Sequence, residues 1–225
     1  MDNPVVLSLN DVVIRKSDVE ILKGKHWIND SIISLCFDHY ENRIFADKPG
    51  YLFISPEVTQ CIKIMPESDI HMFLDPLKAK EKDVIFFPLN DCMDILNPGG
   101  SHWSLLVYSK KDKTLCHYDS LVGRNSYQAN EMSKKIICYL GIAKELMASK
   151  KFAALEIETL QQRNYFDCGI HVICNVELLA EHMQKNYSIY GAGKVKPATV
   201  NKKRADLLRL IEDLQMTGSG NTTEK

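Results

Sequence analysis

The sequence contains no apolar run that approaches the roughly 18 residues a membrane-spanning helix needs. Its first residues, Met1-Asp2-Asn3-Pro4, also lack the basic segment followed by an apolar one that marks a secretory signal peptide. We therefore expect a protein with no membrane partner and no secretory route.

An excess of charge of either sign is also missing. Lysine and arginine number 28 and aspartate and glutamate 29, which leaves a formal net charge of -1 over 225 residues. Domains that bind nucleic acid usually carry a clear basic excess on one face. We therefore expect no nucleic-acid partner, and we interpret the locally basic segment 194–204 as a solvated face.

Metal-binding and disulfide patterns are absent as well. The seven cysteines form no Cys-x-x-Cys pair, and no two histidines stand in a His-x-x-x-His pattern, so we expect no metal ion and no other cofactor. An odd number of scattered cysteines favours free thiols in a reducing compartment, the cytosol or the nucleus. Most of them lie in apolar runs and are interpreted as core residues, such as Cys36, Cys138 and Cys174.

Short apolar runs alternate with amphipathic stretches along the whole chain. No internal repeat and no long linker divides it, so we expect one domain over residues 1–216 and a disordered tail over residues 217–225. The patterns predict strands at 5–7, 12–14, 83–87, 102–108, 114–119 and 152–157, and helices at 17–22, 30–45, 56–64, 68–75, 125–140, 168–184 and from 199 onward.

One cysteine differs from the others because it begins a helix. Asp167 is a good N-cap residue, which places Cys168 in the first turn of the helix that follows. The positive end of a helix stabilises a thiolate, the nucleophilic form of cysteine. We expect Gly169 to leave open space beside the sulfur. A catalytic role for Cys168 further needs a histidine and an acid nearby.

A predicted hairpin supplies such a pair. Folding the chain at about residue 110 or 111 makes the runs 102–108 and 114–119 antiparallel and sets His102 opposite Asp119. A carboxylate beside an imidazole is the arrangement that orients a catalytic histidine. Taken singly, each residue has a plainer interpretation, a strand-end histidine with a local hydrogen bond and an aspartate that starts a turn. Their coincidence favours the catalytic one.

The order histidine, aspartate, glutamine and cysteine matches a known family. The chain resembles the Ulp/sentrin-specific cysteine proteases, which cleave after the Gly-Gly tail of ubiquitin-like modifiers. The residues that carry this resemblance are Gly100-Ser101-His102-Trp103-Ser104-Leu105, His117-Tyr118-Asp119-Ser120 and Gln162 through Asp167-Cys168-Gly169. Further stretches, at 3–8, 27–30, 53–60 and 102–108, are similar to the deneddylase branch of that family. The resemblance extends to about Glu181 and weakens after Tyr187.

The resemblance implies an α+β fold of papain-like character, with a mixed sheet flanked by helices, and a thiol protease and isopeptidase activity. It implies that Cys168 is the nucleophile, His102 the general base and Asp119 the acid that orients it. Gln162 matches the oxyanion-hole residue because it stands six residues before the cysteine, whereas Gln161 is one step too far.

The resemblance also implies how a substrate is held. Trp103 matches the tryptophan that covers the channel for the Gly-Gly tail, and contacts with the modifier are expected from Trp27, Asp30, Asn90 and Asp91. The expected partners are a ubiquitin-like modifier, in this branch the one attached to cullins, and its conjugates. The enzyme would mature the modifier's precursor and remove the modifier from lysines of cullins and other proteins, acting as a monomer.

Several alternatives stay open at this stage. Relatives with the same catalytic order include acetyltransferases and precursor-processing enzymes, a desumoylating protease is the nearest rival, and a catalytically silent modifier-binding module belongs to another class. Trp27 could instead be a hydrophobic staple at a helix start, and Trp103 an ordinary core residue. Arg163 and the pair Tyr165-Phe166 depart from the family's usual residues between the glutamine and the cysteine.

Overall fold

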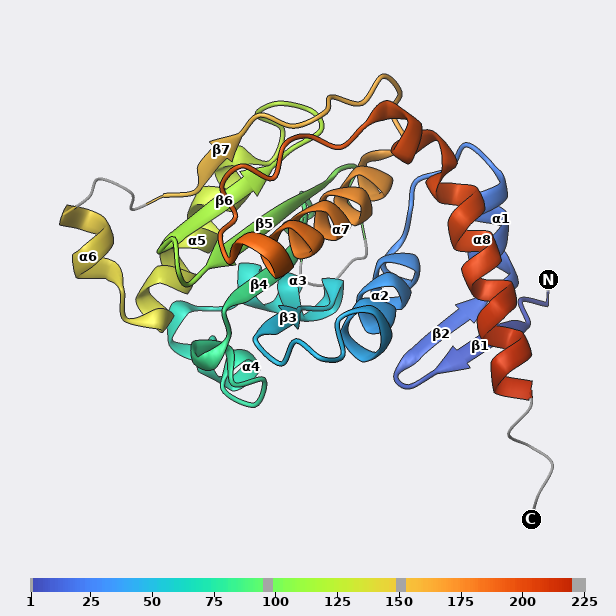
Figure 1. The fold of residues 1–225 in the computed structure, drawn as a ribbon, viewed down its shortest axis with the longest axis horizontal. Helices are drawn as coiled ribbons and strands as arrows, with labels where there is room; N and C mark the ends of the chain where they lie inside the picture. The colour runs from blue at the N-terminus through green and yellow to red at the C-terminus, as the bar shows by residue number, and fades with distance from the viewer. Residues whose placement is uncertain (1, 95–98, 149–152, 220–225) are drawn as a thin grey trace, which may run out of the picture.

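A mixed five-stranded sheet forms the centre of the structure (Figure 1). The computed structural model describes residues 2–94, 99–148 and 153–219. Neighbouring strands follow the order β3-β4-β5-β6-β7; the two outer pairs are parallel and the two inner pairs antiparallel. The strands are β3 (Tyr51–Phe53), β4 (Val84–Asn90), β5 (Trp103–Ser109), β6 (Thr114–Tyr118) and β7 (Leu155–Ile157), with a separate hairpin of β1 (Val5–Leu9) and β2 (Val12–Arg15).

Helices cover both faces of this sheet. Figure 1 shows α7 across one face and α5 and α3 behind the other, while α8 runs beside α1 and the β1–β2 hairpin. The helices are α1 (Lys16–Lys23), α2 (Asp30–His39), α3 (Pro56–Ile64), α4 (His71–Leu74), α5 (Ser126–Leu140), α6 (Ala143–Ala148), α7 (Cys168–Asn186) and α8 (Pro197–Ser219), with a π-helical turn at Tyr40–Ile44 and 3-10 turns at Glu67–Asp69 and Ala79–Glu81. None of the described helices has the length and apolar character that a membrane crossing requires.

The sheet separates two hydrophobic clusters because successive side chains of a strand point to opposite faces. Phe86 of β4 and Leu105 of β5 belong to the cluster under α2, α7 and α8. Their neighbours Phe87 and Leu106 belong to the cluster under α3, α4 and α5. Every residue of β5 is buried, as expected for a strand covered on both sides. The predicted mixed sheet flanked by helices is confirmed.

The predicted hairpin forms, but its register was wrong by two residues. β5 and β6 are antiparallel and pair Leu106 with His117 and Val107 with Cys116. Ser109 pairs with Thr114, so the turn is centred about one residue later than we predicted. A slip of two residues keeps every side chain on its predicted face, since the side-chain period of a strand is two.

The start of α7 departs from the prediction at the cap. Asp167 is the N-cap residue, but its side chain makes no capping hydrogen bond. Its carboxylate instead binds Asn164 at 2.7 Å and the guanidinium of Arg204 from α8 at 2.9 and 3.0 Å. A tertiary ion pair has therefore replaced the local cap that the sequence predicts.

The chain's end also differs from the prediction. Helix α8 begins at Pro197, two residues before the expected cap Thr199, and continues to Ser219. Three residues that were assigned to the tail are therefore helical, while residues 220–225 lie outside the described ones. The strand predicted at 152–157 is observed only over Leu155–Ile157, as β7, and Phe152 lies outside the described residues. Helix α6 was not predicted.

Arg204 offers a test of how α8 holds the fold. Its guanidinium donates to the carboxylate of Asp167 and to the backbone carbonyls of Ile21, His26 and Phe166. A lysine cannot reproduce this planar set of donors. We expect Arg204→Lys to lower the free energy of unfolding by ~2 kcal/mol, the scale of one hydrogen bond to a charged group, as measured by urea denaturation.

A matched control lies on the same helix. The side chain of Arg209 is 74% exposed and its nearest acid, Asp206, is 3.7 Å away. Arg209→Lys should therefore leave the unfolding curve unchanged. Equal unfolding midpoints for the Arg204 and Arg209 variants would contradict the structural role of Arg204.

Candidate active site

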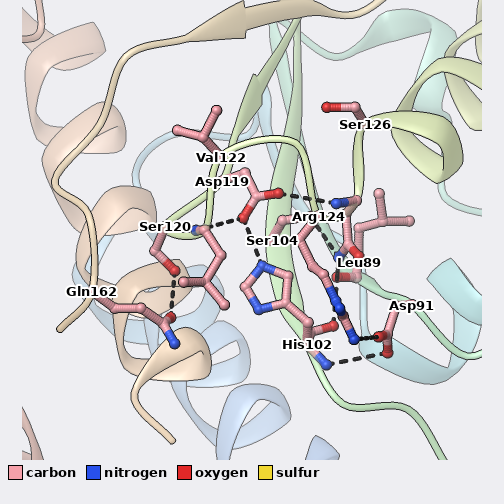
Figure 2. Close-up of polar contacts among 12 residues, drawn as sticks. Leu89, Asp91, His102, Ser104, Asp119, Ser120, Val122, Arg124, Ser126 and Gln162 are labelled. Carbon is pink, nitrogen blue, oxygen red and sulfur yellow. Dashed lines mark hydrogen bonds and ion pairs between the residues drawn. The ribbon is translucent and has the colours of Figure 1, made fainter. Parts of the chain in front are cut away.

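The predicted pair of His102 and Asp119 lies at the end of the β5–β6 hairpin. Nε2 of His102 is 2.6 Å from Oδ1 of Asp119, and both side chains are almost completely buried (Figure 2). His102 immediately precedes β5 and Asp119 immediately follows β6, so both lie just beyond the paired residues. The two-residue register slip therefore did not separate them.

The carboxylate of Asp119 is held from several directions. Its Oδ1 also accepts the backbone N–H of Leu121 at 2.9 Å, and its Oδ2 accepts that of Asn125 at 3.0 Å. Burial by itself would raise the pKa of Asp119, but these hydrogen bonds and the one to His102 outweigh it and keep the pKa below its ordinary value. Asp119 is thus an ionised acceptor for the imidazole.

The imidazole of His102 is correspondingly basic. Burial lowers its pKa, but the hydrogen bond and charge of Asp119, together with the thiol of Cys168, raise the pKa to about 9. The other ring nitrogen, Nδ1, is buried and has no hydrogen bond of ordinary geometry within the described residues. That nitrogen is the one left to exchange a proton with Cys168, because Nε2 faces Asp119.

Cys168 is the first residue of α7 and is buried, with 1% of its surface exposed. None of the seven cysteines, all of which are described, forms a disulfide. Burial raises the pKa of Cys36 far above its ordinary value and that of Cys174 to about 12, so both remain neutral thiols in the core. Cys168 alone among these three has a histidine and an acid beside it.

The space beside the sulfur is not where we expected it. A Cβ added at Gly169 would lie 2.6 Å from Cβ of Ile28, so this glycine is packed closely against the segment before α2. The prediction that Gly169 leaves open space was wrong. Glycine is needed there for close approach of two parts of the fold.

An open cavity of about 320 Å³ lies instead on the other side of the site. Cys168 and His102 both line it, and so do four of the five residues predicted to bind substrate, namely Trp27, Asp30, Asn90 and Trp103. The lining residues are Trp27, Ile28, Asn29, Asp30, Asn90, Gly99, Gly100, Ser101, His102, Trp103 and Cys168.

The two tryptophans lie differently in this cavity. Trp103 is 7% exposed, belongs to the core cluster and donates its indole N–H to the carbonyl of Ile28 at 2.9 Å. Trp27 is 52% exposed and donates to the carbonyl of Tyr165. A hydrophobic staple would be covered, so the staple interpretation of Trp27 was wrong; Trp103 combines a core position with a place in the cavity wall.

The remaining wall contains polar groups. Asp30 starts α2, and partial burial together with the charge of Glu57 raises the pKa of its carboxyl. Asn90 accepts the backbone N–H of Cys92 at 2.8 Å and lies against Gly100, where a Cβ would come within 1.9 Å of its Oδ1. Gly100 also has φ of +99°, which a non-glycine residue rarely adopts.

Asp91, which we expect to contact the modifier, does not line the cavity. Its Oδ1 accepts the backbone N–H of His102 at 3.1 Å (Figure 2). The same oxygen accepts the backbone N–H of Ser101 at 2.6 Å, and Oδ2 accepts the Ser101 hydroxyl at 2.7 Å. These bonds keep the pKa of Asp91 below its ordinary value although burial opposes them. Asp91 therefore holds the backbone that carries His102.

The amide of Gln162 is fixed beside Asp119. Its Oε1 accepts the hydroxyl of Ser120 at 2.7 Å (Figure 2). Its Nε2 donates to the carbonyl of Asn164 at 2.7 Å. The carbonyl of Asn164 can only accept, which fixes which end of the amide is nitrogen. Nε2 carries a second N–H, which remains for another acceptor. Gln162 itself does not line the cavity that contains Cys168.

Sequence reasoning missed two residues of this site. Ser120 orients Gln162. Asn125, read only as a helix start, is completely buried; its side-chain amide donates to the backbone carbonyl of His102 and its backbone N–H donates to the carboxylate of Asp119. The only signal available was their position within six residues after Asp119. Among the described residues, no three His, Cys, Asp or Glu side chains are grouped to hold a metal ion.

The raised pKa of His102 gives a direct test of the pair. We expect Asp119→Asn to lower the pKa of His102 from about 9 toward its ordinary 6.5, because the neutral amide removes the charge that favours the imidazolium. An NMR titration of the ring protons measures this. Asp91→Asn should leave that pKa near the parent value, since Asp91 binds the backbone of His102 and not its ring. Identical titrations for Asp119→Asn and the parent would rule out Asp119 as the source of the shift.

Comparisons with known proteins agree with this geometry. The model of the Ulp1 protease family's C-terminal catalytic domain matches residues 61–205. Human sentrin-specific protease 8 is 38% identical over 94% of this chain and 98% of its own length. NEDD8-specific protease 1 of Arabidopsis thaliana is 31% identical over 95% of both chains.

A solved structure supports the fold. The C-terminal Ulp1 protease domain in complex with Smt3, the yeast orthologue of SUMO, superposes with a TM-score of 0.71 and covers 95% of this chain and 89% of that one at 19% identity. The family model covers more than half of the chain, and the human relative is matched over nearly its full length. The chain with Cys168 at a helix start beside a buried histidine–aspartate pair therefore belongs to the Ulp1 family of cysteine proteases.

Proposed function

We propose that this protease cleaves after the C-terminal Gly-Gly of the modifier NEDD8, both in its precursor and in conjugates on lysine. The observation that carries the proposal is that Cys168 and His102 line the same open cavity, with Asp119 hydrogen-bonded to the imidazole of His102. The choice of modifier is supported by relatives named NEDD8-specific protease and sentrin-specific protease 8, which match most of this chain.

The roles of the three residues follow from their electrostatics. At neutral pH His102 is charged, since its pKa is about 9, and an imidazolium beside Cys168 stabilises the thiolate. The thiolate attacks the carbonyl carbon of the modifier's last glycine and forms a tetrahedral oxyanion. His102 then gives its Nδ1 proton to the leaving lysine amine, and the thioester forms.

Hydrolysis repeats these steps with water. His102, now neutral, takes a proton from water, which attacks the thioester and releases the modifier with a free carboxylate. Asp119 keeps Nε2 protonated throughout and so maintains the orientation of the ring. The free N–H of Gln162 and the backbone N–H of Cys168 are the donors we assign to the oxyanion.

The cavity fits a backbone with no side chains. Trp103 is fixed by its bond to the carbonyl of Ile28, and Gly100 lies against Asn90, so the walls near His102 cannot easily widen. Two glycines pass where a larger residue would collide. We propose that Trp27, Asp30 and Asn90 at the cavity wall contact the modifier, and that Asp91 contributes only by holding the loop.

The free thiols support the proposed cellular setting. Seven unbridged cysteines are suited to the cytosol or nucleus. We propose cullins and other lysine-linked conjugates as substrates, and a protease that acts as a monomer.

A panel of modifier probes tests the proposed function. NEDD8, SUMO and ubiquitin, each ending in an alkyne electrophile, are incubated with the protein, and the adduct is mapped by mass spectrometry. We expect NEDD8 to react fastest and the adduct to form on Cys168, because Cys36 and Cys174 are buried neutral thiols. Fastest reaction with SUMO would indicate a desumoylase. Modifier binding without any adduct would indicate a silent binding module, and an adduct on another cysteine would sink the assignment of Cys168.

The oxyanion role of Gln162 predicts an effect on rate and not on affinity. Gln162→Ala should lower kcat by roughly 10²–10³, the effect of losing one such donor, with little change in KM. Its neighbour is the control: Gln161 donates to the carbonyls of Asp119 and Thr159 and accepts from Val122, so Gln161→Ala should mainly lower thermal stability. A larger kcat loss for Gln161→Ala would show that the glutamine has been misassigned by one residue.

A further inference from the structure

The amide of Asn125 joins the three strand ends around the candidate catalytic pair. It is 0% exposed, and its Nδ2 lies 3.2 Å from the carbonyl of Leu89, 3.4 Å from that of His102 and 3.0 Å from Oγ of Ser104. Its backbone N–H donates to Asp119 at 3.0 Å. One residue therefore contacts the end of β4, the start of β5 and the carboxylate after β6.

The orientation of this amide is not arbitrary. Two backbone carbonyls surround one end of it and can only accept hydrogen bonds, so that end must be the nitrogen. Asparagine at the start of a helix usually caps it, yet the side chain of Asn125 makes no capping bond to α5. The amide is turned into the sheet instead, where it reaches acceptors that a cap would not.

Behind Asn125 lies a chain of hydrogen bonds that ends at the surface. Ser104 Oγ is 2.9 Å from Nε2 of His117, and Nδ1 of His117 is 2.9 Å from both oxygens of Glu156. Ser104 and His117 are buried, whereas the side chain of Glu156 is 48% exposed and also accepts from Ser126 at 2.6 Å.

The donor and acceptor roles along this chain can be assigned. Glu156 accepts, so Nδ1 of His117 carries a proton, and in the neutral imidazole Nε2 is then an acceptor. The hydroxyl of Ser104 therefore donates to His117, which leaves its lone pairs for the amide of Asn125. Serine, histidine and glutamate in this order look like a hydrolytic triad, but Ser104 is 1% exposed and His117 0%, so no substrate reaches them. These hydrogen bonds instead orient the Ser104 hydroxyl so that its oxygen can accept a hydrogen bond from the amide of Asn125.

We propose that Asn125 is a positioning residue for the protease reaction: its amide holds the backbone of His102 and its backbone N–H holds Asp119, with the Ser104–His117–Glu156 chain keeping that amide in place. The inference rests on the proposed function of His102 and Asp119. Misplacing a catalytic imidazole by about 1 Å can cost ~10²-fold in rate. We expect replacement of Asn125 to lower kcat and to leave KM nearly unchanged, because Asn125 does not line the cavity that would hold the substrate.

The test uses the full chain with Asn125→Ala and Asn125→Asp. Alanine removes the amide, and aspartate keeps its shape but points oxygen at two carbonyls. We expect kcat to fall ~10–100-fold with KM within about twofold. The rate at which iodoacetamide alkylates Cys168 at neutral pH should fall as well, because a displaced imidazolium no longer stabilises the thiolate.

Asn130 on the same helix provides the matched control. Its side chain accepts the backbone N–H of Ala154 at 3.1 Å, remote from the strand ends that carry His102 and Asp119. Asn130→Ala should lower the melting temperature and retain kcat. The inference would be overturned if the Asn125 variants behaved in the same way, losing stability with kcat intact, or if they raised KM alone.

Variants of Glu156 provide a second test if the Asn125 variants do not fold. The side chain of Glu156 is half-exposed, so we expect its removal to leave the protein folded. Glu156→Ala should lower kcat about fivefold, the rate equivalent of one ordinary hydrogen bond, whereas Glu156→Gln should stay near the parent because its amide oxygen still accepts from His117. Parent-like kcat in both would refute the supporting chain.

The alkylation assay separates this inference from the proposed function. A parent protein whose Cys168 reacts no faster than Cys36 or Cys174 would contradict the proposed function itself. A reactive parent together with equally reactive Asn125 variants would contradict only the positioning role.

Discussion

The buried hydrogen bond between His102 and Asp119 imposes a constraint on everything around it. Two ionisable side chains with almost no exposure are costly to bury unless each polar atom has a partner. The backbone N–H groups of Leu121 and Asn125 donate hydrogen bonds to the carboxylate of Asp119. The carboxylate of Asp91 accepts the backbone N–H of His102. The ends of β4, β5 and β6 and the start of α5 are arranged to supply these groups, so the burial of this pair constrains four elements at once.

Much of the site could be predicted from the sequence, because the placing of His102 and Asp119 follows from the two-residue periodicity of two neighbouring strands. The hairpin of β5 and β6 predicts that His102 and Asp119 lie at one end of the sheet, and a register error of two residues kept both on the predicted face. Asp112 in the turn binds Ser188 and Ile189 from a distant loop, and sequence spacing contains no information about that contact.

The predictions that were wrong concern side chains whose partners are remote in sequence. Asp167 was expected to cap its own helix but pairs with Arg204, and Gly169 was expected to leave room but faces Ile28. Patterns of neighbouring residues predict contacts within one helix or turn, whereas in the structure these residues connect segments that are distant in sequence.

The bond between Asp167 and Arg204 has a consequence for how the molecule is made. A ribosome delivers the chain from its N-terminus, so the cysteine and the sheet emerge while Arg204 is still to be synthesised. Arg204 is also the side chain that ties the start of α7 to the segment between α1 and α2. A nascent chain therefore carries its nucleophile before it carries the anchor of the nucleophile's helix, and the start of α7 gains this ion pair only when residue 204 has been added.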